Sequence, residues 1–315
     1  MKDAEDPGES TPRWSTIAAL GTSQTLAWAS TYYLPAVLAG PMARELGVSV
    51  QLVFAAFSAA LVISALLGPY AGRAIDRLGG RPVLIATSFV FASGLGLMAI
   101  ASGPVGLFIA WAVLGVGMGS GLYEAAFSTL VRLHGRNTRG AISGVTLFAG
   151  FASTIGWPLS AFLETHFGWR GACYGWAGLH LLIGLPLNWS LPKASTSLEI
   201  EDPALAAGES RTSRPRRASL LLAFVFAATW FTSTAMAAHL PRLLQAGGAS
   251  LTTAIAVGAL IGPAQVAGRL LELGALRHFH PFLSARLASV MHPIGRPLVF
   301  RAVSDGTQSQ QWRGD

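Results

Sequence analysis

Residues 68–85 read GPYAGRAIDRLGGRPVLI and interrupt long apolar runs on both sides. Within this stretch Arg73, Asp76, Arg77 and Arg81 lie inside nine positions and are interleaved with glycines. Charged residues make up 12% of the 315 residues and hydrophobic residues 52%, whereas soluble domains carry roughly 25% charged residues. The composition therefore predicts an all-α integral membrane protein, with the charged stretch as a turn at the membrane surface.

Seven intervals contain no Asp, Glu, Lys or Arg and are long enough for a spanning helix, which needs about 20 residues. One of them is long enough for two helices, and Gly103-Pro104 divides it where a reversal is expected. The sequence therefore predicts eight transmembrane helices. The intervals are 14–43, 46–72, 82–123, 140–163, 171–192, 218–241 and 243–268.

Basic residues are concentrated in alternate loops. If the N-terminus is cytoplasmic, thirteen basic residues fall in inner segments and three, Arg44, Arg170 and Arg242, in outer loops. The first residues also lack the charged-then-apolar order of a secretory signal. We therefore expect a multi-pass protein of the inner (cytoplasmic) cell membrane with a cytoplasmic N-terminus.

Composition divides the chain into five predicted parts. A polar tail precedes the helices, and a Pro/Ser-rich segment of mixed charge, typical of a flexible linker, separates six helices from two. The final residues have no apolar period and are expected to be disordered. The parts are a cytoplasmic tail 1–13, a six-helix bundle 14–190, a cytoplasmic linker 191–217, two further helices 218–272 and a tail 273–315.

The two helical parts resemble each other in sequence. LLGPYAGRAIDR, which ends the second predicted helix, has a counterpart in LIGPAQVAGRLLE, which ends the eighth. Each contains Gly-Pro, then Gly-Arg, then an acid three residues after the arginine, Asp76 in one and Glu272 in the other. Such a sequence similarity between two parts of one chain is typical of transporters built from parallel repeats.

The charged turn resembles the signature of the major facilitator superfamily, G-x-x-x-D-R-x-G followed by two basic residues. The GWR sequence at 168–170 is also similar to the family. Gly80 replaces the first of the two basic residues. The positions that match are Gly72, Asp76, Arg77, Gly79 and Arg81.

The resemblance implies two helical bundles and a conformational latch formed by this turn. The latch would contact the opposite bundle, with the acid at a helix N-terminus there. We expect the glycines at 72, 79 and 80 to adopt positive φ angles and Asp76 to pair with the arginines. The alternative is that the arginines only set the topology. The latch residues are Gly72, Arg73, Asp76, Arg77, Gly79 and Arg81.

Three features depart from the family pattern. Trp111 replaces an arginine that is tied to proton coupling in many members, and Gly156-Trp157-Pro158 only partly matches a motif of drug antiporters. The family has twelve helices, and this chain has eight. We therefore expect a chain truncated after the eighth helix, with an incomplete C-terminal bundle. The alternative is a natural six-plus-two form that completes itself by oligomerising.

Polar and aromatic residues inside spanning helices usually face protein or a water-filled path. Gln24, Trp28 and Tyr32 are spaced at i, i+4 and i+8 and share one helix face. The alternatives are ordinary packing and, for Tyr32 and Tyr33, an outer aromatic belt. We also expect Pro158 to bend the fifth helix near a site. The candidate cavity residues are Gln24, Trp28, Tyr32, Trp157, Trp230 and Thr234.

Glu124 and His239 are candidate proton or salt-bridge sites. Glu124 follows a run of glycines near one end of the fourth helix, and His239 lies near the end of the seventh. The favoured alternative for Glu124 is pairing with Arg73, Arg77 or Arg132 at the membrane surface. For His239 it is a hydrogen-bonded interfacial position.

The sequence analysis favours a secondary active transporter that moves a small organic solute by alternating access. It does not decide whether transport is coupled to a proton. No catalytic cluster, metal-binding cluster or nucleotide-binding loop is present in the sequence, so we expect no enzyme activity, no cofactor, no metal and no nucleic-acid partner. The lipid bilayer is the expected environment. The alternatives are a truncated, non-transporting fragment and a membrane scaffold or regulatory subunit.

Overall fold

The computed structural model describes residues 14–135, 138–193 and 216–274, and over these ranges all regular structure is helical. This confirms the predicted all-α membrane fold. The predicted tail 1–13, nearly all of the predicted tail 273–315 and most of the predicted linker 191–217 lie outside the described residues.

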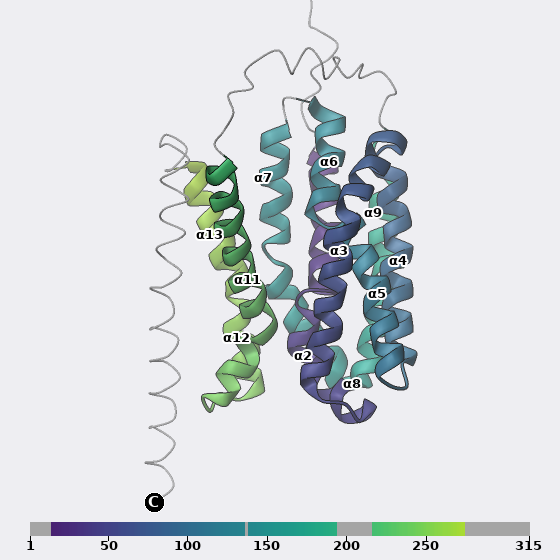
Figure 1. Cartoon of the computed structure of the whole chain (residues 1–315), viewed down its shortest axis with the longest axis vertical. Helices are drawn as coiled ribbons and strands as arrows, with labels where there is room; N and C mark the ends of the chain where they lie inside the picture. Colours follow the sequence, from purple (N-terminus) through teal and green to yellow (C-terminus); the bar gives the residue numbers. More distant parts are fainter. Residues whose placement is uncertain (1–13, 136–137, 194–215, 275–315) are drawn as a thin grey trace, which may run out of the picture.

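The helices form an N-terminal bundle and a C-terminal group that lies beside α7 and α8 (Figure 1). The C-terminal group consists of α11 (Arg216–Ala246), α12 (Leu251–Ala259) and α13 (Ile261–Gly274). The bundle consists of α1 (Trp14–Ala29), α2 (Leu34–Leu46), α3 (Val50–Leu78), α4 (Gly80–Ile100), α5 (Pro104–Gly121), α6 (Tyr123–His134), α7 (Thr138–Ala149), α8 (Ala152–Leu179), the π-helical turn η2 (His180–Gly184) and α9 (Leu185–Trp189).

Six helical stretches of the described chain are long and apolar enough to cross a membrane, compared with the eight predicted. The first predicted helix is divided into α1 and α2, each too short by itself. The stretch Thr138–Trp189 folds back at Gly168, where φ is 68°, and Trp176 donates a hydrogen bond to Ser160 across the fold. The pair α1–α2 adds one passage to the six stretches, and Thr138–Trp189 counts as two passages instead of one. The structure thus contains the eight predicted helical passages.

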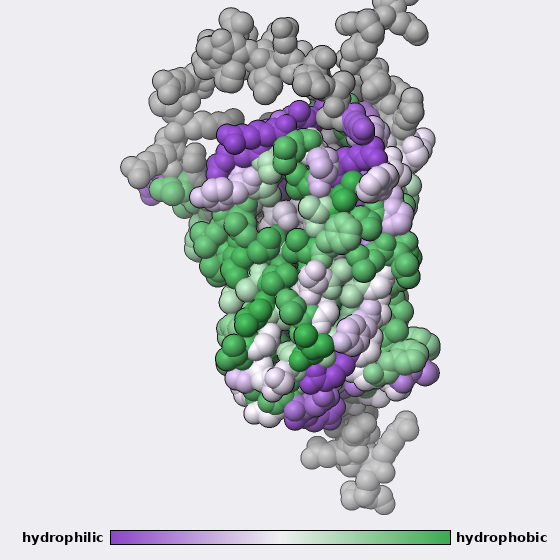
Figure 2. All heavy atoms as spheres, turned by 90° about the vertical axis from the view of Figure 1, so that its right-hand side faces the viewer, coloured by the Kyte–Doolittle hydropathy of each residue, from purple (hydrophilic) through white to green (hydrophobic). Residues whose placement is uncertain are grey.

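Hydrophobic side chains cover the middle of the molecule on the face shown in Figure 2, and hydrophilic side chains gather toward its ends. We call the end that carries Arg77, Arg81 and Arg132 the basic end. The other end, which carries Arg170, is called the opposite end. An apolar band between two polar ends is the surface expected of a protein that spans a lipid bilayer, whose apolar core is about 30 Å thick.

The charged stretch forms a tighter turn than predicted. α3 continues to Leu78 and α4 begins at Gly80, so Gly79, with φ of 85°, is the only residue between them. Gly72 lies within α3, and positive φ angles at residues 72 and 80 are therefore not observed. A Cβ atom at Gly80 would overlap the side chain of Thr129. This contact explains why glycine replaces the basic residue of the family signature.

Two of the three arginines of the turn contact aromatic rings rather than Asp76. The Arg73 guanidinium lies 4.4 Å from the centre of the Tyr70 ring, and that of Arg81 lies 5.6 Å from the centre of the Trp189 ring. Such cation–π contacts are worth about 0.5–1 kcal/mol at exposed sites. They hold the two arginines at the ends of α3 and α4.

The Asp76 carboxylate is exposed, and the predicted pairing with arginine is wrong in this conformation. Arg132 donates a hydrogen bond to the backbone carbonyl of Asp76. Among the described residues one ion pair is formed, between Arg170 and Glu45 at the opposite end. Asp76 is therefore available at the surface of the basic end.

Arg170 joins three segments at the opposite end. Its guanidinium contacts Glu45 at 2.7 Å, donates hydrogen bonds to the carbonyls of Ala99 and Ala101, and stacks over the ring of Trp169. The Trp169 indole N–H also donates to Glu45. The hydrogen bond from Arg170, followed by that from Trp169, lowers the pKa of the Glu45 carboxyl. The GWR sequence thus ties the end of α2 to the turn between α4 and α5.

Candidate functional site

The helices around the centre of the molecule are interrupted. The first break separates α1 from α2 at residues 30–33, just before Pro35. Proline has no N–H group, so the carbonyl of Thr31 loses its usual helical partner. The indole N–H of Trp157 donates to the carbonyl of Tyr33 at 3.1 Å, and Ser30 bonds the His180 ring at 2.8 Å. Side chains of neighbouring helices therefore hold residues on both sides of Thr31 in place at this break.

The second break separates α5 from α6 at Leu122, which has an extended conformation. It follows a run of glycines, which disfavour helix by about 1 kcal/mol each relative to alanine. The buried side chain of Gln24 donates a hydrogen bond of 2.7 Å to the carbonyl of Gly121. Gln24 thereby stabilises the break, beyond which Tyr123 and Glu124 begin the next helix.

Two further breaks meet where the bundle contacts the C-terminal group. α7 ends before Gly150 and α8 begins at Ala152, while α12 ends at Ala259 and α13 begins at Ile261. A Cβ atom at Gly262 would overlap Thr154 and lie 2.8 Å from the carbonyl oxygen of Gly150. The fifth predicted helix is thus interrupted at 150–151, and Pro158 lies inside α8. The bend at Pro158 stays a prediction.

Three adjoining cavities lie between the bundle and the C-terminal group. The aromatic cavity, about 290 Å³, and the wide cavity, about 680 Å³, share five lining residues: Trp28, Tyr32, Tyr123, Trp230 and Thr234. A third space of about 420 Å³, the arginine cavity, is lined by Tyr123, Trp230, Gln265 and Arg269 among others. The three spaces share Tyr123 and Trp230, so these two residues stand at the centre of the candidate site.

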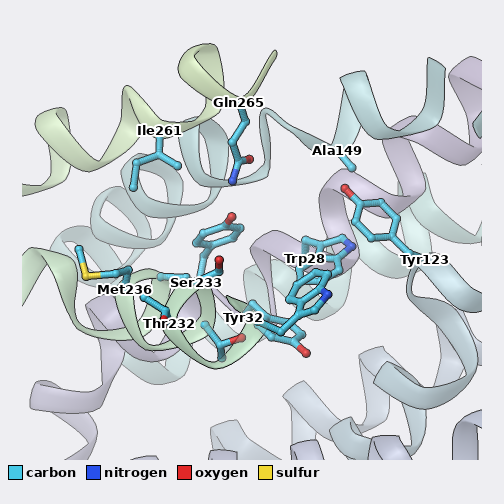
Figure 3. Close-up of a pocket in the computed structure, with 13 residues that line it drawn as sticks. Trp28, Tyr32, Tyr123, Ala149, Thr232, Ser233, Met236, Ile261 and Gln265 are labelled. Carbon is cyan, nitrogen blue, oxygen red and sulfur yellow. The ribbon is translucent and has the colours of Figure 1, made fainter. Parts of the chain in front are cut away.

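Aromatic rings dominate the walls of the aromatic cavity. The ring of Trp28 lies 4.4 Å from Tyr32, 4.9 Å from Tyr123 and 6.2 Å from Trp230, measured between ring centres. The Trp28 indole N–H is buried and has no hydrogen-bond partner among the described residues. Figure 3 shows Trp28, Tyr32 and Tyr123 around the same space as polar residues of α11 and α13, including Ser233 and Gln265.

The structure brings together four of the six candidate cavity residues. Trp28 and Tyr32 come from the first predicted helix, and Trp230 and Thr234 from α11. Gln24 and Trp157 lie elsewhere, because both are fully buried in helix packing and line none of the four cavities described. Tyr32 faces the cavity rather than an outer aromatic belt.

Glu124 lines the wide cavity, and the predicted pairing with an arginine is wrong. It lies in the first turn of α6, where the helix dipole favours a negative charge. It forms no ion pair with another described residue. His239 is outside the cavities, and its ring packs at 4.2 Å on Phe54 between α11 and α3.

The cavities are closed toward the opposite end. In the second half of α11, Ala238, Leu240 and Pro241 are buried. Leu240 of α11 and Ile255 of α12 belong to the same hydrophobic core as residues of α2 and α3. This half of the C-terminal group is therefore packed firmly on the bundle.

The cavities are open toward the basic end. Every described side chain of α11 between residues 220 and 228 is exposed, including Phe224 at 70%. The wide cavity extends along this half of α11 to Ser64 and Pro69 in the later part of α3. The first half of α11 and the later part of α3 thus lie on either side of the wide cavity, while α7 lies beside α11 and α13 in Figure 1.

Several lining residues were not predicted from the sequence. Gln265 is an amide within an apolar helix, which is the same signal that pointed to Gln24. Tyr123 and Tyr33 face the cavity because they lie at helix breaks. Trp111, which replaces the family arginine, is fully buried against Phe57 and lines none of the described cavities.

A family model of the Major Facilitator Superfamily matches residues 20–295, and the chain belongs to this family. The membership confirms the predicted family and, together with the apolar helices, a multi-pass membrane protein. The fold is similar to the crystal structure of a D-xylose–proton symporter, with a TM-score of 0.62 and 16% identity over 84% of this chain and 69% of that one.

The chain is also similar to a curated relative, an uncharacterized 38 kDa protein in the 23S RNA operon of Thermoproteus tenax. The two are 28% identical over 236 residues, which cover 73% of this chain and 58% of that protein. The chain therefore matches less than two thirds of that relative's length.

Proposed function

We propose that the chain is a secondary active transporter that moves a small organic solute by alternating access. The cavities between the bundle and the C-terminal group support this proposal most directly. They are sealed at one end by buried apolar packing and open at the other. Such a gated central site between two helical groups is what alternating access requires. Trp28, Tyr32, Trp230 and Thr234 are the proposed solute contacts.

The basic end is proposed to face the cytoplasm. Arginines are enriched on the cytoplasmic side of membrane proteins, and Arg77, Arg81 and Arg132 lie at this end. The N-terminus would then be cytoplasmic, the membrane would be the inner membrane of the cell, and the conformation would be open to the inside.

The charged turn remains our proposal for a conformational latch. Asp76 is exposed at the basic end, where the two halves are apart. Closure at this end would bring the turn toward the C-terminal half, where its carboxylate meets a helix N-terminus. The proposed latch consists of Gly72, Arg73, Asp76, Arg77, Gly79 and Arg81.

Transport is tested by reconstituting the full chain in liposomes and measuring uptake of radiolabelled cationic, anionic and neutral solutes. The panel includes D-xylose with and without a proton gradient, because the structural relative is a D-xylose–proton symporter. We expect saturable uptake of one solute class. A folded chain that transports no member of the panel would support the alternative of a scaffold or regulatory subunit.

Site-specific labelling provides a readout that does not depend on flux. Cys173 is the only cysteine of the sequence and is buried, so a Cys173→Ala background is suitable. Ser64→Cys in the wide cavity should react with a maleimide added from the basic end, and a transported solute should slow the reaction. Gln245→Cys, which is exposed at the opposite end, is the control: it should react with a maleimide added from that end, and the solute should not slow this reaction. Equal protection at both positions would contradict the proposed site.

A further inference from the structure

We propose that the solute is an organic cation, whose substituted ammonium group binds in the wide cavity between Glu124 and the surrounding aromatic rings. This inference rests on the proposed transport function and adds the charge and chemical class of the solute to it.

The charge of the cavity walls is the first observation. Glu124 is the only charged residue among the described residues that line the aromatic and wide cavities. It forms no ion pair with another described residue. An ionisable side chain that faces a cavity within a membrane protein usually marks a solute or ion path. A cationic group would compensate this carboxylate.

The aromatic walls are the second observation. Trp28, Tyr32, Tyr123 and Trp230 line both the aromatic and the wide cavity. The faces of these rings carry negative electrostatic potential and attract a cation within about 6 Å of the ring centre. Tryptophan is the most favourable of these rings and contributes two of the four. The walls therefore suit an alkylated ammonium group, which is weakly hydrated and has an apolar surface.

A backbone acceptor is the third observation. Ala65 and Pro69 of α3 both line the wide cavity. Pro69 has no N–H group, so the carbonyl of Ala65 lacks its regular helical donor. Ser64, beside it, contributes a hydroxyl group to the same wall. Carbonyl and hydroxyl oxygens accept hydrogen bonds from an ammonium group or its hydration water.

The position of Arg269 indicates where the cation binds. Arg269 lines the arginine cavity together with Thr146 of α7 and Gly150, which follows α7. Glu124 and Ala65 lie instead where the wide cavity approaches α3. An ammonium group is therefore expected on the α3 side of Tyr123 and Trp230, away from the positive charge of Arg269.

The test compares choline and tetramethylammonium with 3,3-dimethylbutan-1-ol, the neutral carbon analogue of choline, by titration calorimetry on the purified full chain. We expect both cations to bind and the neutral alcohol to bind at least about tenfold more weakly, which corresponds to one ion pair plus cation–π contacts. Glu124→Gln should lower the affinity for the cations by about tenfold or more. Glu164→Gln, a carboxylate that lines the cavity at the opposite end, is the matched control and should leave it unchanged.

Equal affinity for choline and the alcohol, no binding of either cation, or unchanged cation affinity in a folded Glu124→Gln variant would overturn the inference. Trp230→Leu provides a second test if Glu124→Gln does not fold, because Trp230 is half exposed and its replacement removes one ring. It should reduce the preference for choline over the alcohol, and an unchanged preference would count against the proposal. Saturable liposome uptake of an anionic or neutral solute alone would leave the transport function standing while rejecting the cation.

Discussion

Gln24 illustrates how one buried amide shapes the candidate site without lining it. Its Nε2 group donates to the carbonyl of Gly121 at the break before α6, and its side chain is completely buried. The two residues that follow the break, Tyr123 and Glu124, face the wide cavity. The hydrogen bond of Gln24 therefore helps to position Tyr123 and Glu124 in the cavity wall, although Gln24 itself does not line the cavity.

Replacing Gln24 with leucine should destabilise the protein by about 1–3 kcal/mol, because the carbonyl of Gly121 would be left unsatisfied in a buried position. Thermal unfolding of the purified protein in detergent measures this loss. Gln245→Leu, at an exposed position on α11, is the matched control and should have little effect. Equal stability of the two variants would show that the Gln24 bond contributes nothing to the fold.

Glu45 contributes a pH-dependent contact at the opposite end. Its carboxyl pKa is lowered from an ordinary value of about 4.5, mainly by the hydrogen bond from Arg170. A lowered pKa means that the ionised form is preferred in the folded protein, so the stabilisation is present above the ordinary pKa and is lost as the pH falls through the lowered one.

Glu45→Gln should therefore be less stable than the parent protein at neutral pH, and the difference should shrink as the pH falls below about 4.5. Melting temperatures measured across this range check the prediction. In an Arg170→Gln background the difference should be strongly reduced at every pH. A difference that persists unchanged in acid would exclude the ionised contact as its cause.

At the scale of elements, the broken helices depend on one another. Pro263 lacks the N–H group that would bind the carbonyl of Ala259, and this carbonyl instead accepts a hydrogen bond of 2.7 Å from Thr154 of α8. The same junction places Gly258 against the ring of Trp157 and Gly262 against Gly150. A proline in one helix thus creates a polar contact that joins the C-terminal group to the bundle.

Thr154→Val should cost about 1 kcal/mol, because it removes the hydroxyl group while keeping the shape of the side chain. The cost should be smaller in a Pro263→Ala background, where residue 263 regains an N–H group that can bind the Ala259 carbonyl within its own helix. A double-mutant cycle of unfolding free energies measures this coupling. Strictly additive effects would mean that Thr154 does not replace the bond that Pro263 removes.

At the scale of the whole molecule, the packing between the two halves is unequal along their length. The second half of α11 and the first part of α12 join the hydrophobic core of the bundle. The first half of α11 is exposed along every described side chain from 220 to 228. If the halves rock during transport, the packed end must separate while the open end closes.

A cross-link across the packed end should therefore stop transport. The Phe54 and His239 rings pack there with their centres 4.2 Å apart, so a short reducible bis-methanethiosulfonate cross-linker should join Phe54→Cys to His239→Cys in a Cys173→Ala background. Uptake should fall to the level of empty liposomes and return on reduction. Each single cysteine variant is the control, and uptake that survives complete cross-linking would contradict the rocking movement.

The sequence by itself determined that the chain is helical and lies in a membrane, and it predicted eight helical passages. These properties follow from local composition, because lipid requires each spanning segment to be apolar and to satisfy its own backbone. It also indicated Trp28, Tyr32, Trp230 and Thr234 as residues of one site, since aromatic and polar groups are unusual inside such segments.

The tertiary structure alone decided which side chains face one another. Gln24 and Trp157 carry the same sequence signal as Trp28, yet they bind carbonyls at helix breaks instead of lining a cavity. Glu124 faces open space rather than an arginine. The physical reason is that lipid specifies the polarity of a helix but not its rotation or its breaks, which depend on packing against neighbouring helices.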